Sequence, residues 1–237
     1  MANHYFKFKQ FTIWQDKCAM KVTTDACLFG SLLPYSAIHK KALDIGTGTG
    51  LLSLMYAQKN PTHSIDAVEI DAEAAIQAAQ NVAQSPWPNA IQIQHTDILQ
   101  FSPKSKYDII FCNPPFYEND LKGKVYARNV AHHDECLKLP LLLATIANLL
   151  QQDGCFFLLL PYKRYDEIKK SLGASSLGLT AVTLVRQSIH HSYFRVILHG
   201  HKKEISTVIE KELSICQSDH NYTTDFIQLL QNYYLYL

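Results

Sequence analysis

The sequence lacks any large excess of charge. It contains 22 Lys and Arg residues against 21 Asp and Glu residues, so its formal net charge is only +1. A domain that binds nucleic acid mainly through charge is usually far more basic. The near-neutral net charge therefore disfavours such a domain, although a basic patch on one face is compatible with a net charge near zero.

The sequence also lacks the features of secreted and membrane proteins. None of its six cysteines forms a C-x-x-C pair, and Cys112 and Cys155 lie in apolar runs, where a thiol behaves as a small hydrophobe. We therefore expect a reduced protein rather than a disulfide scaffold. The N-terminus has no apolar signal core, and no apolar run has the length of a membrane span. These absences predict a cytoplasmic location and no membrane partner.

Strand patterns and helical patterns alternate from residue 40 onward. The first five predicted strands cover 41–45, 64–70, 91–95, 107–112 and 155–160, and the first helix between them is predicted over 51–59. This alternation predicts a mostly parallel sheet with helices on both faces. The last two of seven predicted strands, 179–187 and 193–199, have no helix between them, so we expect an antiparallel hairpin at one edge. The predicted fold class is therefore α/β, with a doubly wound seven-stranded mostly parallel sheet and an antiparallel edge strand. A terminal helix is predicted over 224–236.

A glycine-rich turn follows the first of these strands. The residues Gly46, Thr47, Gly48, Thr49 and Gly50 have G-x-G-x-G spacing after Asp44, and glycines at such a turn let the backbone approach a ligand closely. The turn has no phosphate-loop lysine, which disfavours ATP or GTP. A nicotinamide-binding domain would instead have G-x-G-x-x-G spacing.

Acidic residues are predicted at the ends of the next two strands. Glu69 is placed to accept hydrogen bonds from two ribose hydroxyls, and Asp97 from the amino group of an adenine. The neighbouring apolar residues Ile70 and Ile98 belong to the same candidate site. The expected ligand is an adenosine without an obligatory phosphate. In order and spacing, residues 44–161 resemble S-adenosylmethionine-dependent methyltransferases, which implies that S-adenosylmethionine is the cofactor.

The fourth strand ends in an unusual sequence, Asn113, Pro114, Pro115 and Phe116. An exocyclic amine is a poor nucleophile because its lone pair is delocalised into the ring. The Asn113 side-chain oxygen and the Pro114 carbonyl are two acceptors that could draw the amine toward tetrahedral geometry. The two prolines hold the backbone in place before the substrate arrives, and Phe116 could stack on an extruded base.

This sequence resembles the N-P-P-[FYW] signature of amino methyltransferases. These enzymes act on adenine N6, cytosine N4, guanine N2 or a glutamine side-chain amide, and the motif does not choose among them. An Asn-Pro-Pro turn that merely ends a strand is the alternative interpretation.

Residues 6–33 resemble the N-terminal signature of the N6-adenine methyltransferases that modify adenine 37 in a valine tRNA. The resemblance implies that this segment covers the cofactor, with Lys21, Thr24 and Asp25 near its amino-acid end. A helix N-cap at Thr24 or Asp25 is the alternative, and both roles are compatible. We expect one domain over residues 1–237, in which 1–39 form the covering segment and 40–237 the catalytic core.

Residues 125–137 also resemble this family, and Arg128 is a candidate contact to RNA phosphate or a stacking partner of a nucleotide. A surface loop before a helix cap at Asp134 is the alternative. Two His pairs, 132–133 and 190–191, have no third ligand at a sensible spacing, so no metal site is predicted.

The function that these patterns favour is N6-methylation of adenine in tRNA, with tRNA as partner and no obligate protein partner. A guanine N2 enzyme acting on rRNA or a glutamine-amide enzyme is the second hypothesis. Such enzymes usually carry an extra N-terminal domain, for which residues 1–39 are too short. A nucleic-acid-binding module with a decayed methyltransferase core is the third, and it predicts broken motifs.

Overall fold

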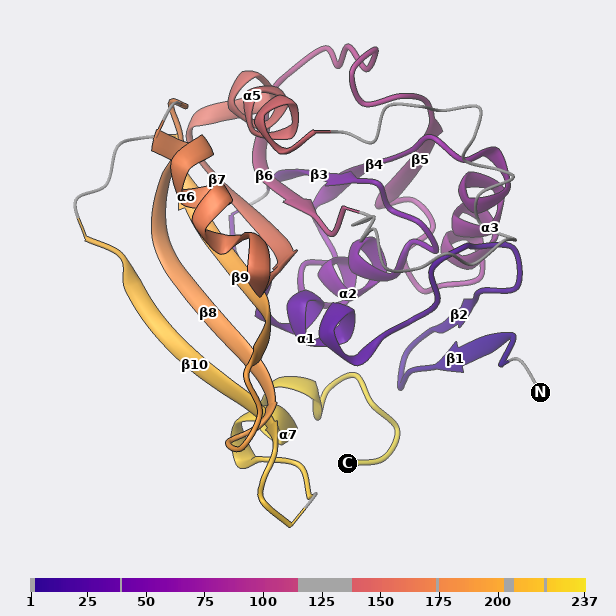
Figure 1. Ribbon diagram of the computed structural model, residues 1–237. Coiled ribbons are helices and arrows are strands. Elements are labelled where there is room, and N and C mark those ends of the chain that lie inside the picture. Colours follow the sequence, from indigo (N-terminus) through magenta and orange to yellow (C-terminus); the bar gives the residue numbers. More distant parts are fainter. Residues whose placement is uncertain (1–2, 39, 115–137, 174, 203–206, 220) are drawn as a thin grey trace, which may run out of the picture.

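A computed structural model describes residues 3–38, 40–114, 138–173, 175–202, 207–219 and 221–237 (Figure 1). The main sheet has eight strands in the order β10-β8-β9-β7-β6-β3-β4-β5. Its strands are β3 (Lys41–Ile45), β4 (Ser64–Glu69), β5 (Ile91–His95), β6 (Tyr107–Cys112), β7 (Leu150–Pro161), β8 (Gly178–Ser188), β9 (Tyr193–His201) and β10 (Ile209–Cys216). β9 is antiparallel to both of its neighbours, and every other pair in the sheet is parallel.

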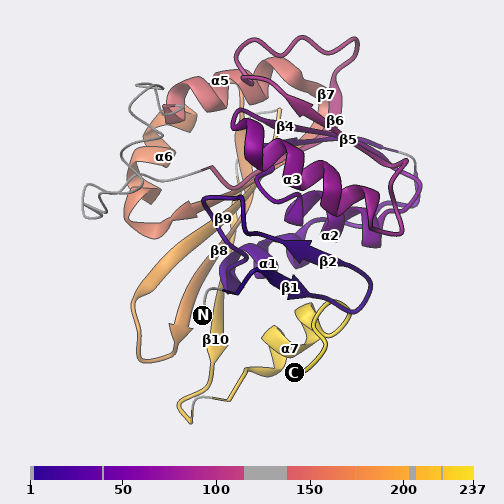
Figure 2. The same cartoon turned by 90° about the vertical axis from the view of Figure 1, so that its right-hand side faces the viewer.

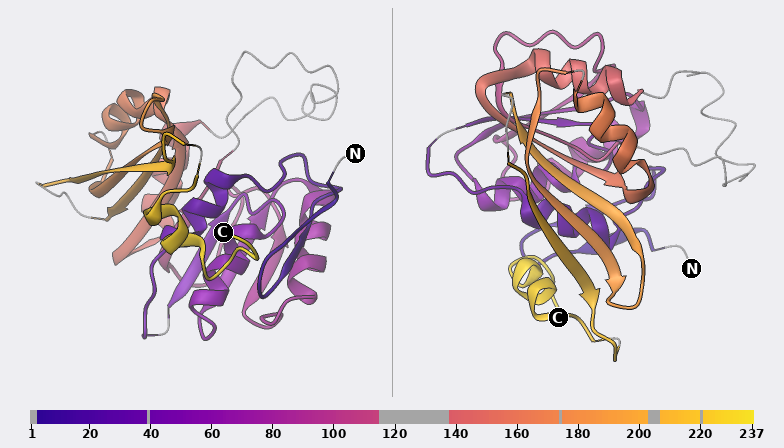
Figure 3. Two further views of the ribbon diagram at one scale, coloured as in Figure 1. Left: turned by 90° about the horizontal axis from the view of Figure 1, so that it is seen from below. Right: turned by 60° about the vertical axis from the view of Figure 1, so that its left-hand side comes forward.

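Helices cover both faces of this sheet. The helices are α1 (Thr24–Leu32), α2 (Leu51–Lys59), α3 (Ala72–Ala83), α5 (Leu139–Leu149), α6 (Tyr165–Gly173) and α7 (Thr224–Leu230), and a 3-10 turn, η1 (Tyr162–Arg164), precedes α6. The core is divided accordingly, because α1, α2 and α7 pack into one cluster of buried residues and α5 and α6 into the other. Figure 3 shows the orange and yellow C-terminal strands on one side of the molecule and the purple strands and helices on the other.

The central strands are apolar on both faces, which explains their continuous hydrophobic runs. In β6, Ile109 and Phe111 enter the first cluster, whereas Ile110 and Cys112 enter the second. This alternation follows from the two-residue period of a strand that is covered on both sides.

The N-terminal segment forms a small separate sheet that packs on α3. Its strands β1 (Tyr5–Lys7) and β2 (Thr12–Trp14) are antiparallel, and Figure 2 shows this hairpin beside α3. Segments near the two ends of the chain also meet, because Phe8 bridges to Tyr234 and the Lys9 N–H donates to the Tyr233 carbonyl at 2.8 Å.

The predicted fold class is confirmed, but three details of the prediction are wrong. The sheet has eight strands rather than seven, because β10 adds to β8. The antiparallel strand β9 lies inside the sheet, between β7 and β8, rather than at the edge. The last helix, α7, ends at Leu230, before the predicted end at residue 236. β10 was missed because its exposed first half has four charged or exposed positions in a row, which hides the strand pattern.

Candidate active site

The glycine-rich turn between β3 and α2 has the left-handed backbone conformation that its glycines allow. Gly46, Gly48 and Gly50 have φ values of 69°, 56° and 82°, in the left-handed region that favours glycine. The N–H groups of Gly46 and Thr47 both donate to the Val68 carbonyl, at 2.9 and 3.1 Å. A methyl group added at Gly46 or Gly48 would meet no atom of the described residues within 4 Å. The turn therefore presents bare backbone to open space.

Glu69, the last residue of β4, holds this turn in place. One oxygen of its carboxylate accepts from the Gly48 N–H at 2.8 Å, and the other accepts from the Asp71 N–H at 2.9 Å. Asp71 in turn caps α3, since its side chain accepts from the Ala74 N–H at 2.8 Å. Each carboxylate oxygen of Glu69 has a second lone pair, so the residue can still accept from a ligand.

Asp44 lies beneath the turn and is completely buried. Its Oδ2 accepts from the hydroxyls of Thr47 at 2.6 Å and Ser53 at 2.7 Å, while its Oδ1 is buried without a partner among the described residues. Burial raises the pKa of this carboxyl group to about 6. An unsatisfied buried oxygen is costly, so this atom marks a place where a ligand donor would be favourable.

The predicted adenine-binding residues occupy the same edge of the sheet. Asp97 lies in the loop after β5 rather than at the end of that strand, which stops at His95. Its Oδ1 accepts from the Leu99 N–H at 2.9 Å. Ile98 is buried, whereas Ile70 is 48% exposed and offers an apolar surface beside Glu69.

The first turn of α1 lies at this edge as well, because α1 runs parallel to α2. Gly30 in α1 approaches Met55 in α2, and the amine of Lys59 donates to the carbonyls of Ser31 and Leu33, both at 2.6 Å. The two helices therefore have their C-termini together and their N-termini together. The N-terminus of α2 is the end of the glycine turn, so the start of α1 lies near that turn.

Three residues were predicted near the amino-acid end of the cofactor, and two of them lie in the first turn of α1. Thr24 and Asp25 are its first residues, but the N-cap is Thr23, whose side chain accepts from the Ala26 N–H at 3.4 Å. The alternative of a cap at Thr24 or Asp25 is therefore wrong. Lys21 is exposed and donates to the Asn3 carbonyl at 3.3 Å.

The target motif begins where predicted, at the carboxyl end of β6. Asn113 is half-buried and Pro114 is buried. Cys112, the last residue of β6, is paired with Ile45, the last residue of β3, so Asn113 and Gly46 leave adjacent strands at the same edge. The remaining predicted residues of the target site, Pro115, Phe116 and Arg128, lie outside the described residues.

Comparisons with known proteins agree with this geometry. The family model described as "Methyltransferase small domain" matches residues 18–154. A tRNA1(Val) (adenine(37)-N6)-methyltransferase from Dyadobacter fermentans is 39% identical over 98% of both chains. One of the same name from Bacteroides thetaiotaomicron is 37% identical over 100% of both chains. This chain belongs to the tRNA1(Val) (adenine(37)-N6)-methyltransferase family.

Solved structures of other methyltransferases share the fold at low sequence identity. A predicted O-methyltransferase from Agrobacterium tumefaciens has a TM-score of 0.68 and is 17% identical, with 88% of this chain and 96% of that chain covered. A methyltransferase from Pyrococcus furiosus has a TM-score of 0.55 and is 21% identical, with 74% and 80% covered. At these identities the likeness establishes the fold class, and the family rests on the sequence relatives.

The structure of this family member also reveals two supporting residues that the sequence analysis missed. Gln77 and Asn81 are buried amides on α3. Asn81 bonds both backbone groups of Trp14 at 2.9 Å and donates to the Thr49 carbonyl at 2.9 Å. Gln77 accepts from the N–H groups of Lys17 and Cys18 at 3.1 Å.

These two amides fasten the N-terminal segment to α3, and Asn81 also joins it to the glycine turn. A signal was available in the sequence, since two amides four residues apart share one face of an otherwise alanine-rich helix. Buried amides on such a face need specific partners, but the sequence does not name them.

Proposed function

We propose that this protein transfers a methyl group from S-adenosylmethionine to N6 of adenine 37 in a valine tRNA. The observation that carries the proposal is the placement of Asn113 and Pro114 at the end of β6, beside the glycine turn at the end of β3. The substrate is taken from the names of relatives that are 35–39% identical over nearly the whole chain. A decayed methyltransferase core would have lost the cofactor motif or the target motif. Both motifs are present in the sequence, and the structure describes the target motif as far as Pro114.

The exposed backbone and the hydrogen-bonding groups of the site suit S-adenosylmethionine. The glycine turn leaves open space over Gly46 and Gly48, where a side chain would take the place of the ligand. Glu69 would hold the ribose, and Asp97 with the apolar residues Ile70 and Ile98 would hold the adenine. The buried Oδ1 of Asp44 has no partner among the described residues and could accept from a ligand donor. Lys21, Thr24, Asp25, Thr47 and Gly50 would surround the methionine part. The cofactor supplies a methyl group bound to a positively charged sulfur.

The residues after β6 activate the nucleophile. The Asn113 side-chain oxygen and the Pro114 carbonyl accept the two hydrogens of the adenine amino group, which frees its lone pair for attack on the methyl carbon. Pro114 has no N–H to compete for these acceptors and restricts Asn113 to extended backbone. As the N–C bond forms, the bond between the methyl carbon and the sulfur would break, and the sulfur would keep that electron pair and leave as a neutral thioether. The positive charge then lies on the nitrogen, which loses its proton to water. Pro115 would hold Pro114 in place, and Phe116 would stack on the base.

We further propose that residues 1–237 act as one catalytic unit and that Arg128 contacts the RNA. Since tRNA is the substrate, the expected compartment is the cytoplasm. No helix among the described residues is long and apolar enough to cross a membrane. The described part of the chain also contains no cluster of three or more His, Cys, Asp or Glu residues suited to a metal ion.

The test is an assay of the purified protein with S-adenosylmethionine and a valine tRNA transcript, followed by mass spectrometry of the nucleosides. We expect N6-methyladenosine with the natural transcript and none when adenine 37 is replaced by guanine. An rRNA fragment and a glutamine-containing peptide from a release factor test the alternative substrates. Methylation of either of these, without methylation of tRNA, would assign the alternative function.

The Asn113→Ala variant tests the mechanism. Loss of one preorganised polar contact to the reacting group typically lowers kcat by about 10²–10³-fold, whereas cofactor affinity should change little. Asn148→Ala is a matched control, because Asn148 is an exposed asparagine on α5. Full activity of Asn113→Ala on tRNA would rule out the proposed role of the amide.

A further inference from the structure

One ion pair joins the first turn of α1 to strand β9, in the C-terminal part of the sheet. The Nε–H of Arg195 donates to Oδ2 of Asp25 at 2.6 Å, across 170 positions of sequence. The Asp25 side chain is 13% exposed and that of Arg195 is 32% exposed. A short, partly shielded, charge-assisted hydrogen bond restricts both side chains more than an exposed pair would.

The position of Asp25 places its carboxylate at the cofactor site. It is the second residue of α1, whose N-terminus lies at the same edge as the glycine turn because α1 and α2 run parallel. Figure 1 shows these two helices beside each other. The contact with Arg195 occupies Oδ2, which leaves Oδ1 available to a second donor.

Arg195 is too far from the glycine turn to contact it directly. It lies on β9 opposite Pro161 of β7, and the sheet order places three strand spacings between β9 and β3. At 4.7–4.9 Å per spacing, this separation is roughly 14 Å. That distance exceeds the reach of an arginine side chain, so the contact with Asp25 is what links Arg195 to the first turn of α1.

The same helical turn is supported from a second direction by the C-terminal segment. The side chain of Tyr234 interacts with those of Thr24 and Cys27. Two segments far apart in sequence thus converge on a single turn of α1.

We propose that Arg195 is a positioning residue, which aims the carboxylate of Asp25 at the α-ammonium group of the cofactor's methionine part. The proposal rests on the proposed function, because it assumes an S-adenosylmethionine site. The guanidinium holds one carboxylate oxygen, and the other oxygen accepts from the ammonium group. Without Arg195 the carboxylate is free to rotate away, and the cofactor loses one charge-assisted hydrogen bond.

The test compares two ligands that differ in the amino-acid part. S-adenosylhomocysteine has the α-ammonium group, whereas 5′-methylthioadenosine lacks the whole amino-acid part. Titration calorimetry with Arg195→Ala should show about tenfold weaker binding of S-adenosylhomocysteine, and binding of 5′-methylthioadenosine within about twofold of the unaltered protein. Asp25→Asn should show the same selectivity.

Two further variants control for charge and folding. Arg195→Lys keeps one N–H donor and the charge, so it should recover most of the affinity for S-adenosylhomocysteine. Arg186→Ala removes an arginine from the adjacent strand β8 that pairs with Glu212, and it should leave both affinities unchanged.

The outcomes separate the two proposals. Equal weakening of both ligands by Arg195→Ala, or no weakening of either, would overturn the positioning role while leaving the cofactor site intact. Failure of the unaltered protein to bind S-adenosylhomocysteine would overturn the proposed function and this inference with it.

Discussion

Two regions of the molecule hold their polar side chains in different ways. At the carboxyl ends of β3 and β4, the contacts join residues close in sequence, such as Thr47 to Asp44 and Gly48 to Glu69. Around α1, the N-terminal segment and the outer strands, they join distant residues, such as Arg195 to Asp25 and Asn81 to Trp14. The first region can form from one βαβ unit, whereas the second exists only when the whole chain is folded.

The difference shows that the two regions have different roles in the site. The local region contains the residues that we propose for binding the cofactor's adenosine, and its geometry depends on backbone conformation. The long-range region positions the N-terminal segment, and its geometry depends on side-chain pairs across the sheet. Variants in the first region should therefore change ligand affinity. Variants in the outer strands should mainly change stability, except at Arg195, which acts on the ligand through Asp25.

The largest expected effect is on the glycine turn. Gly48 has a φ of 56° and lies under open space, so in Gly48→Ala the backbone is strained and the methyl group occupies space that the ligand would use. The left-handed conformation costs about 1–2 kcal/mol for a residue with Cβ, so the turn should relax in the free protein and must regain this conformation to bind. This cost alone weakens binding roughly 5- to 30-fold, and with the intruding methyl group we expect roughly hundredfold weaker cofactor binding by calorimetry.

Gly173→Ala is the matched control for this variant. Gly173 has no positive φ and also has space for a methyl group among the described residues. The Gly173→Ala variant should therefore bind the cofactor with unchanged affinity. Equal affinities of the two variants would show that the turn does not contact the cofactor.

The pH dependence of stability should have opposite signs in the two regions. Burial raises the pKa of Asp44 above its unfolded value, to about 6. The folded state then binds more protons between about pH 4 and 6, so this residue's contribution falls by about 3 kcal/mol as the pH rises through that range. Asp44→Asn should remove this loss, as measured by urea unfolding at several pH values.

His199 on β9 provides the opposite case. Burial, followed by the nearby His201, lowers the pKa of His199 to about 4. The unfolded state binds more protons between about pH 4 and 6.5, so the stability that comes from neutral His199 is lost as the pH falls through that range. His199→Gln should flatten the acid side of the curve. The two substitutions should therefore change the pH dependence of the free energy of unfolding in opposite directions. Changes of the same sign would contradict the environments of Asp44 and His199.

A smaller effect is expected at Gly200 in the outer strands. A Cβ at this position would lie 2.4 Å from the Gly178 carbonyl oxygen and 2.5 Å from the Phe156 ring. Gly200→Ala should lower the free energy of unfolding by about 1–3 kcal/mol through overpacking. Cofactor affinity, measured where the variant is folded, should stay the same, and a selective loss of affinity would show that the regions are coupled.

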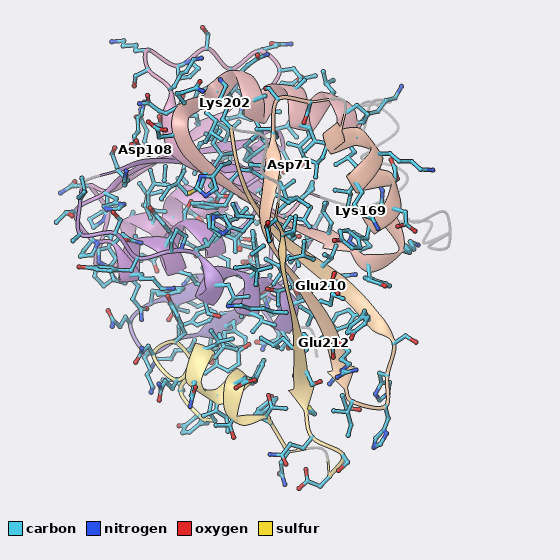
Figure 4. All side chains as sticks on the ribbon, turned by 90° about the vertical axis from the view of Figure 1, so that its left-hand side faces the viewer. Asp71, Asp108, Lys169, Lys202, Glu210 and Glu212 are labelled. Atoms are coloured by element: carbon cyan, nitrogen blue, oxygen red, sulfur yellow. The ribbon has the colours of Figure 1, made fainter. Side chains whose placement is uncertain are left out.

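The smallest effect is expected at the acidic edge strand. Glu210 and Glu212 lie along β10 (Figure 4), and Glu212 pairs with Arg186 through a side chain that is 54% exposed. Exposed pairs contribute at most about 1 kcal/mol. The double variant Glu210→Gln, Glu212→Gln should change both stability and tRNA affinity little, because this acidic edge is unsuited to a phosphate backbone. A large gain in tRNA affinity would place the RNA close to β10.

Much of the local region could be predicted from the sequence. The bounds of β3, α2, β5 and β6 agree with the predicted ranges, since two-residue and helical periods are strong there. The glycine turn and Glu69 also have their expected positions. β10 was missed because its first half is exposed and its pairing partner β8 is distant in sequence. The β1–β2 hairpin was missed because its two strands have only three residues each, which is too short for a clear pattern.

The sequence by itself determined the glycine turn, the acidic residues that follow the strands and the Asn-Pro-Pro corner, because their conformations depend on φ preferences and on neighbours a few residues away. Only the tertiary structure decided that β9 lies inside the sheet, that Asn81 joins the N-terminal segment to the turn, and that Arg195 meets Asp25. These contacts depend on which surfaces meet when the sheet closes and the helices pack, and that information is distributed over the whole chain.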